Sequence, residues 1–174
     1  VASLRGQAGV VNSFGGDVNA LDDLQEGATL VRGFEYGGYG PRLKPQNTVC
    51  NSDPSAPGPG CTNLSGYGGE YVGETSYAGL SAELQFPIPY LPESYGLAGA
   101  IWADSAYIEG TPNIGSPGGT LDPASTDNPF KASVGASILW DSPFGPLRGD
   151  VAYVISKATS DKTQLFSLTL QTLL

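Results

Sequence analysis

Apolar residues alternate with small or polar residues in several stretches of this chain. Such alternation is typical of β-strands, because successive side chains point to opposite faces of a strand. The stretches have about the length that a tilted strand needs to cross a bilayer. We predict six strands: residues 76–86, 130–140, 147–155 and 166–171 form four clear ones, and residues 1–10 and 96–104 form two weaker ones.

The polar face of each predicted strand consists of small and mostly uncharged residues. In the stretch 76–86, for example, Ser81 and Glu83 alternate with Ala82 and Leu84. A secreted β-sandwich also alternates in this way, but its solvent face would be richer in Lys and Glu. The composition of the polar faces therefore favours a transmembrane β-barrel, in which the apolar faces contact lipid.

The segments between the predicted strands are of two kinds. Residues 87–94 and 141–146 are short turns rich in Pro and Gly, whereas 33–74 and 109–129 are long, rich in Gly, Pro, Asn and Ser, and have no period. Short turns at one end of the strands and long loops at the other are typical of outer-membrane barrels. Aromatic residues at strand ends, where interface girdles lie, agree with this. They are Phe86, Tyr90, Phe130, Trp140 and Phe144.

Composition narrows the functions that this chain can have. Its 174 residues are enough for one domain, and 25 Gly with 14 Pro argue against a helical bundle. A net charge of −9, with eight scattered basic residues, argues against binding to nucleic acid. The chain has no His, which excludes histidine-based catalysis and histidine ligands for a metal, and no Met, which suggests a mature chain or part of a longer one. We therefore predict no enzyme, no cofactor and no metal site.

Five groups of motifs occur in order along the chain. They read LVRGF at 30–34 with GPR at 40–42, AELQFPIP at 82–89, IWAD at 101–104, ASVG at 132–135 with LWDSPFGPLR at 139–148, and DKTQLF at 161–166. Together these motifs resemble the barrel domain of BamA-type outer-membrane protein assembly factors, the BamA/TamA superfamily. The resemblance implies an all-β fold: an antiparallel transmembrane barrel of sixteen strands, of which residues 1–174 correspond to the last six strands plus a loop inserted into the lumen. On this interpretation, residues 33–74 form a long loop with the lumen motif and both cysteines, and the earlier strands and the periplasmic POTRA domains lie outside this chain.

The same resemblance implies roles for residues of the lumen loop. The lumen-loop motif consists of Val31, Arg32, Gly33 and Phe34. Arg32 is expected to pair with Glu83 or Asp104 on the barrel wall, and Glu83 lies on the polar face of its strand by alternation alone. Gly33 is expected to have a positive φ or to approach the wall closely. Phe34 is expected to anchor the loop tip by apolar burial, worth on the order of 2 kcal/mol.

Two further features depend on this interpretation. Cys50 and Cys61 are the only cysteines, and in an oxidising compartment we expect them to form a disulfide that stiffens an extracellular loop. The final strand resembles the targeting signal of outer-membrane barrels. Its apolar positions are Phe166, Leu168, Leu170 and Leu174. It departs from the usual signal because it ends in a leucine instead of an aromatic residue.

The resemblance implies an insertase of the bacterial outer membrane, with long loops extracellular and short turns periplasmic. Its expected partners are unfolded outer-membrane proteins as clients, accessory assembly lipoproteins and the lipid bilayer. The expected mechanism is a lateral seam between the first and last strands, at which an incoming strand pairs by β-augmentation. The alternatives are a TamA-like translocation and assembly factor, a passive outer-membrane channel, or a secreted binding module.

Overall fold

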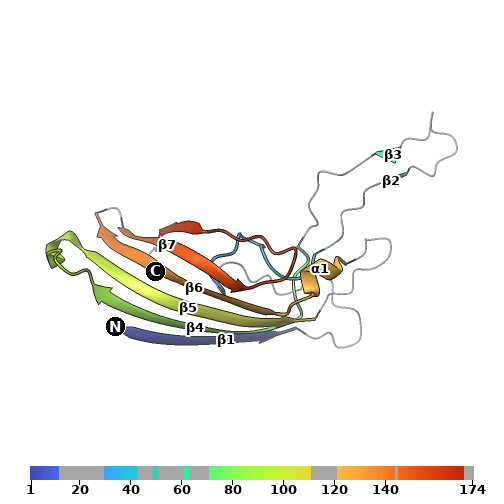
Figure 1. The fold of residues 1–174 in the computed structure, drawn as a ribbon, viewed down its shortest axis with the longest axis horizontal. Helices are drawn as coiled ribbons and strands as arrows, with labels where there is room; N and C mark the ends of the chain where they lie inside the picture. Colours follow the sequence, from blue (N-terminus) through green and yellow to red (C-terminus); the bar gives the residue numbers. More distant parts are fainter. Residues whose placement is uncertain are drawn as a thin grey trace.

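The computed structural model describes residues 1–11, 30–42, 49–50, 61–62, 71–110, 121–143 and 145–170; of residues 49–50 and 61–62 it describes the backbone only. Six strands form one antiparallel sheet in the order β1-β4-β5-β6-β7-β8, in which each strand pairs with the next along the chain (Figure 1). The strands are β1 (Ala2–Val10), β4 (Ser76–Pro87), β5 (Leu97–Glu109), β6 (Phe130–Ser142), β7 (Gly145–Ser156) and β8 (Phe166–Leu170). A separate pair, β2 (Val49–Cys50) and β3 (Cys61–Thr62), forms a two-stranded ladder. The predicted set of six strands in sequence order is thus confirmed.

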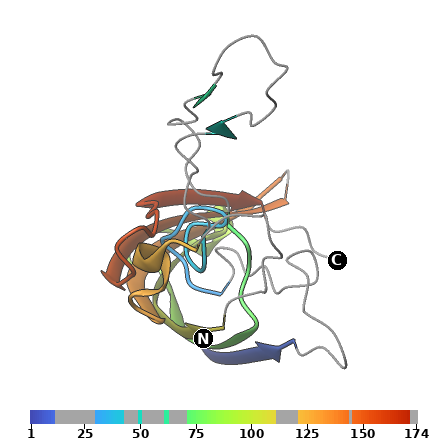
Figure 2. The same ribbon diagram turned by 90° about the vertical axis from the view of Figure 1, so that its right-hand side faces the viewer.

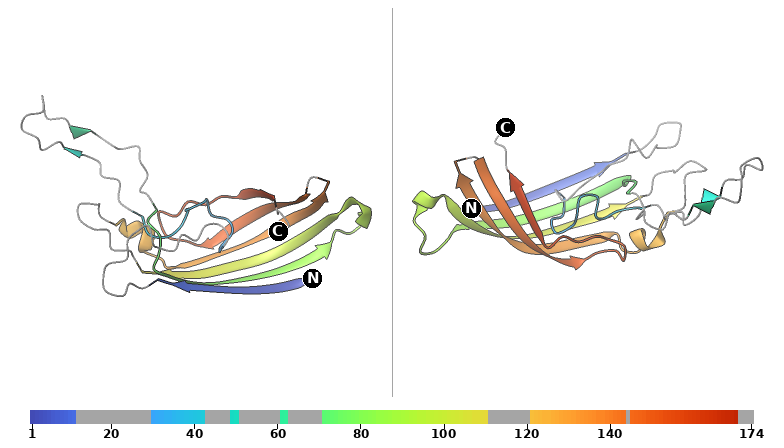
Figure 3. Two further views of the ribbon diagram at one scale, coloured as in Figure 1. Left: turned by 180° about the vertical axis from the view of Figure 1, so that it is seen from behind. Right: turned by 90° about the horizontal axis from the view of Figure 1, so that it is seen from above.

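The sheet is an open arc with β1 and β8 at its two edges (Figure 2). The 3₁₀ turn η1 (Glu93–Tyr95) lies between β4 and β5, at the end of the strands where the short connections are. The single-turn helix α1 (Pro123–Thr126) lies at the opposite end, with the long connections (Figure 3). The strand ends joined by the short connections and those joined by the long connections therefore lie at opposite ends of the sheet.

Strand β5 continues to Glu109, beyond the predicted end at residue 104. Alternation of polar and apolar residues is lost there because both faces are apolar: Tyr107 points outward, whereas Ala106 and Ile108 are buried on the inner face. Helix α1, within a segment that we predicted to be irregular, begins at an N-cap residue, Asp122, that accepts a hydrogen bond from the Ala124 N–H, with Pro123 in the first turn.

The two faces of the sheet have the reverse polarity of a soluble sandwich. Outward side chains are apolar and exposed, among them Leu80, Ile101, Val134, Ile138, Val151 and Tyr153. Inward side chains are polar and buried, among them Asp104, Lys131, Ser133, Ser137, Arg148 and Asp150. This arrangement is typical of the wall of a transmembrane barrel. Among the described residues, no helix is both long and apolar enough to span a bilayer.

The buried apolar cluster lies between the concave face and the segment 30–42, which we call the inner loop (light blue in Figure 2). The cluster consists of Leu30, Val31, Phe34, Tyr39, Ala106 and Ile108. The rings of Phe34 and Tyr39 pack edge to face with centroids 5.0 Å apart. The sheet therefore has its apolar core against one loop and not against a second sheet.

Backbone hydrogen bonds join the inner loop to the segment that precedes β8. The Glu35 N–H donates to the carbonyl of Lys162 (3.1 Å), the Lys162 N–H to that of Gly38 (2.7 Å), and the Gln164 N–H to that of Gly33 (2.9 Å). These bonds fix the position of the loop tip relative to the segment that precedes β8.

Candidate functional site

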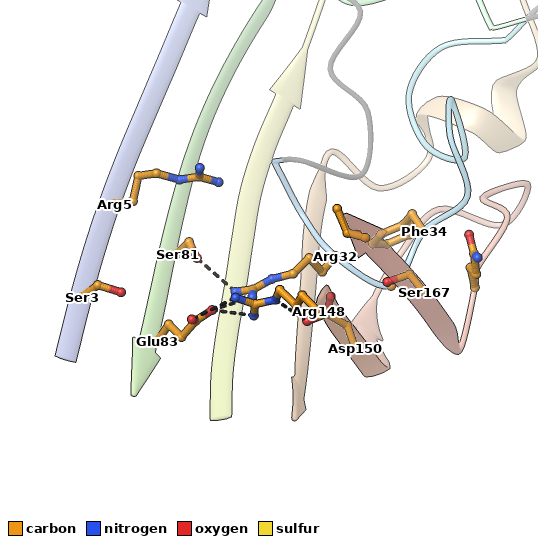
Figure 4. Close-up of a pocket in the computed structure, with 12 residues that line it drawn as sticks. Ser3, Arg5, Arg32, Phe34, Ser81, Glu83, Arg148, Asp150 and Ser167 are labelled. Atoms are coloured by element: carbon orange, nitrogen blue, oxygen red, sulfur yellow. Dashed lines mark hydrogen bonds and ion pairs between the residues drawn. The ribbon is translucent and has the colours of Figure 1, made fainter. Parts of the chain in front are cut away.

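Arg32, at the tip of the inner loop, contacts carboxylates on two neighbouring strands. Its Nε and Nη2 atoms donate to Asp104 Oδ2 (2.7 Å) and Oδ1 (2.8 Å), which is a two-pronged pairing. Its Nη1 atom donates to Glu83 Oε2 at 2.7 Å (Figure 4). The sequence offered Glu83 and Asp104 as alternative partners, and the structure brings both to Arg32 at once.

Further contacts fix the orientation of the Arg32 guanidinium. Asp104 also accepts hydrogen bonds from the Arg32 backbone N–H (3.1 Å) and from the Ser81 hydroxyl (2.7 Å). The guanidinium carbon lies 3.9 Å from the ring centroid of Trp102, so a cation–π interaction adds to the ion pairs. Trp102 can lie against the wall because Gly135 has no side chain: a Cβ at Gly135 would be 2.2 Å from Trp102 Cζ2.

A second arginine, Arg148 on β7, shares the Glu83 carboxylate. Its Nη1 and Nη2 atoms donate to Glu83 Oε1 (3.0 Å) and Oε2 (2.7 Å), and its Nε donates to Asp150 Oδ1 at 2.9 Å. Its Nη2 also donates to the Ser137 hydroxyl (2.9 Å), which in turn accepts from Trp102 Nε1 (2.8 Å). Arg148 and Asp150 were not among the predicted site residues, although alternation along 147–155 places both on the polar face of that strand.

We call these five charged side chains the inner-wall network: Arg32, Glu83, Asp104, Arg148 and Asp150. The network has two positive and three negative charges, and the exposed fractions of its side chains range from 2% to 18%. Charges in such a confined position are stable only when they are paired and hydrogen-bonded. The network can therefore hold a cationic loop tip against an anionic wall.

The remaining motif residues fit the loop to the wall sterically. Gly33 has a φ of +92°, and a Cβ there would lie 2.8 Å from the Cβ of Ala152 on β7. Gly33 thus has both of the properties that the sequence offered as alternatives, a positive φ and a close approach to the wall. Val31 and Phe34 are buried in the apolar cluster.

A second ion pair lies near the long-connection end of the sheet. Lys131 Nζ is 2.7 Å from Asp161 Oδ2, and both side chains are fully buried. Lys131 also donates to the carbonyl of Asn128 at 2.8 Å. Burial raises the pKa of Asp161 above its usual range, although the hydrogen bond from Lys131 acts in the opposite direction. The pair joins β6 to the segment that carries the backbone bonds to the inner loop.

At the same end, Asp127 is exposed and accepts hydrogen bonds from both the hydroxyl and the backbone N–H of Thr159. These bonds, the hydroxyl first, hold the pKa of Asp127 below its ordinary value of 3.8.

The other residues singled out in the sequence are described only in part. Cys50 and Cys61 are directly opposite each other in the β2–β3 ladder, but their side chains lie outside the described residues, so the disulfide stays a prediction. On β8, Phe166, Leu168 and Leu170 are exposed on the outward face, and Leu174 lies outside the described residues. Phe144 also lies outside them, whereas the other four aromatic residues at strand ends are exposed.

An open cavity of about 450 Å³ lies beside the inner-wall network. Its lining combines Arg32 and Phe34 of the inner loop with inward residues of β1 and β8, such as Arg5 and Ser167 (Figure 4). Among the residues whose structure is described, no three Cys, Asp or Glu side chains are grouped so as to hold a metal ion.

Comparison with known proteins places this geometry in context. The model of the Omp85 superfamily domain matches residues 1–172. The chain is 26% identical, over 192 residues, to the outer membrane protein assembly factor BamA of Neisseria meningitidis serogroup B (strain ATCC BAA-335 / MC58), in an alignment that covers 97% of this chain and 21% of that protein. It is also similar to the crystal structure of BamA from Haemophilus ducreyi lacking POTRA domains 1–3, with a TM-score of 0.66 and 23% identity over 96% of this chain and 30% of that one. The chain thus spans about a fifth of the length of the curated relative that it matches.

Proposed function

This chain belongs to the Omp85 superfamily, and on that premise we propose that it forms the last six strands of an outer-membrane barrel that folds and inserts other barrel proteins. The apolar outward face and the polar inward face support a position in the outer membrane. On this proposal the earlier strands and POTRA domains lie outside residues 1–174.

The observation that carries the proposal is the docked tip of the inner loop. A loop that only connected β1 to β4 would not need a partly buried arginine held by carboxylates of two strands. Because unpaired buried charges are unfavourable, the network makes the docked position of the loop specific. We propose that docking of the inner loop holds the inner wall in the conformation that assembles client proteins. The residues proposed to dock the loop are Val31, Arg32, Gly33 and Phe34.

The proposed insertion step takes place at the edge of β8. Over the described residues β8 is an edge strand of the sheet, and its one neighbour is β7. An edge strand has a row of backbone N–H and C=O groups on its outer side, which suits it to pair with a neighbouring first strand or with an incoming strand. Burial of the client's apolar face and formation of its hydrogen bonds drive the reaction, so no cofactor or catalytic residue takes part.

The proposed partners rest on the similarity of this chain to BamA. They are unfolded outer-membrane proteins as clients, accessory assembly lipoproteins, and the surrounding lipid. The long connections, including the one with Cys50 and Cys61, are proposed to face the cell exterior, and the short turns the periplasm.

The test is folding of a client in vitro. An unfolded outer-membrane barrel protein is added to liposomes with or without the whole protein, and its folding is followed by heat-modifiable gel mobility. The proposal expects faster folding in liposomes that contain the protein. Conductance without any effect on folding would indicate a passive channel and contradict the proposal.

A further inference from the structure

We propose that Arg148 is a positioning residue of the inner-wall network: it holds the Glu83 carboxylate in place so that Arg32 of the inner loop docks on a preformed site. This inference deepens the proposed function, because it concerns the same docking site.

Arg148 and Glu83 are on strands that are not neighbours. Along the ladders, Glu83 aligns with Trp102 on β5, Gly135 on β6 and Ala152 on β7, and Arg148 lies four residues before Ala152. With strands about 4.8 Å apart and residues about 3.3 Å apart, the two Cα atoms would be about 20 Å from each other on a flat sheet. Even fully extended, the two side chains do not span that distance. The pair therefore forms across the concave side of a curved wall, over the strands β5 and β6.

The contacts of Arg148 fix its own orientation before the loop is considered. Its Nε is bonded to Asp150, and its Nη2 to the hydroxyl of Ser137. That hydroxyl is held by Trp102 and by Asp150. The guanidinium is thus set by groups of β5, β6 and β7, and it presents Nη1 and Nη2 to the two oxygens of Glu83.

This arrangement determines what the inner loop meets. Without Arg32, the inner-wall network has three carboxylates and one arginine, so its wall residues keep a net negative charge that attracts the loop tip. Arg148 and Gln85, which donates to Glu83 Oε1 at 2.8 Å, keep Glu83 oriented, and its Oε2 atom accepts from both arginines. Without Arg148, Glu83 would keep Gln85 and Arg32 as its hydrogen-bond donors, and Asp150 would lose its arginine.

A competing interpretation predicts that Arg148 weakens the docking of the inner loop instead of supporting it. The two guanidinium groups have the same charge and share one oxygen atom, so Arg148 could weaken docking by repelling Arg32 and competing for Glu83. Replacing Arg148 then separates the two interpretations: loss of a positioning residue loosens the loop, whereas loss of a competitor tightens it.

The experiment is hydrogen exchange of the Glu35 and Gln164 amides, whose hydrogen bonds join the inner loop to the segment that precedes β8, in the whole protein folded in nanodiscs. For Arg148→Gln we expect exchange at these amides to accelerate about tenfold or more, the effect of losing a hydrogen bond between charged groups. The matched control, Arg5→Gln, removes an arginine from β1 that lines the same cavity and is expected to change the rate less than twofold. If Arg148→Gln fails to fold, the milder variant Ser137→Ala takes its place. Ser137→Ala removes one hydrogen bond of Arg148 and is also expected to accelerate exchange.

A double variant shows whether the effect passes through Arg32. In an Arg32→Ala background, Arg148→Gln is expected to cause no further acceleration. Arg148 acts by holding Glu83 in position for Arg32, and in this background Arg32 is absent. Slower exchange in Arg148→Gln, an unchanged rate, or an equal acceleration in both backgrounds would overturn the inference. Because exchange measures docking itself, these outcomes are independent of whether the protein assembles clients.

Discussion

The substitution Gly33→Ala tests the steric fit between the inner loop and the wall. A Cβ at this position lies 2.8 Å from the Cβ of Ala152 and 3.2 Å from Cγ2 of Val154, and the backbone φ is +92°. The Ala152 Cβ cannot move away without its strand, so the loop tip has to withdraw. A positive φ costs an alanine about 1–2 kcal/mol, and overpacking costs about 1–3 kcal/mol. We therefore expect docking to weaken by about 2–5 kcal/mol.

Gly37 provides the matched control within the same loop. It also has a positive φ, of +57°, but the atoms nearest to a Cβ there belong to the Tyr71 side chain, and the nearest of them lies at an ordinary distance of 3.6 Å. Gly37→Ala should therefore cost only the conformational part, about 1–2 kcal/mol. Exchange of the Gln164 amide, which donates to the Gly33 carbonyl, reports the opening free energy of the loop.

The expected difference between the two variants is about 1–3 kcal/mol, which corresponds to roughly 5- to 150-fold in exchange rate. Equal acceleration in Gly33→Ala and Gly37→Ala would show that the close approach to Ala152 has no energetic importance. Wild-type exchange in Gly33→Ala would refute the steric reasoning as a whole.

Two further predictions concern the long-connection end of the sheet. Cys50 and Cys61, opposite each other in the β2–β3 ladder, should form a disulfide: a non-reducing digest should yield one cross-linked peptide, and two thiols that react with iodoacetamide without reductant would contradict this. Asp127 should titrate with a pKa below 3.8, because its charged form accepts two hydrogen bonds from Thr159. The stabilisation of the folded state by these bonds is therefore present above the unfolded-state pKa and is lost as the pH falls through the lowered pKa. Carbon-13 NMR of the carboxylate should show this, and Thr159→Val should move the pKa back toward 3.8.

Alternation alone was sufficient to predict the six strands, because each strand has one face toward a polar interior and the other toward an apolar surrounding. It failed at the end of β5 for the same reason: at Ala106 and Ile108 the interior is the apolar cluster under the inner loop, so both faces become apolar. Helix α1 has a sequence signal, Asp122 followed by Pro123, but a helix of four residues has no periodicity that would reveal it.

The sequence predicted several residues of the candidate site, but it did not predict all the contacts between them. The motif resemblance indicated Arg32, and alternation placed Glu83 on the polar face. Alternation also placed Arg148 on a polar face, but its contact with Glu83 depends on the curvature of the wall and on the register of three ladders. Neither quantity can be read from one strand. The same limit explains why Glu83 and Asp104 were alternatives in the sequence and joint partners of Arg32 in the structure.

The measurement that tests the central claim most directly is client folding by an Arg32→Ala variant of the whole protein in liposomes. The substitution leaves the buried Asp104 carboxylate without its arginine, a loss that typically costs about 3–5 kcal/mol at a buried pair. The barrel itself should stay folded, as judged by heat-modifiable mobility, because the ladders between strands are untouched. If docking of the inner loop is required for assembly, the rate of client folding should fall about tenfold or more relative to wild type and to the control Arg5→Ala. Client folding at the wild-type rate by a folded Arg32→Ala protein would contradict the account.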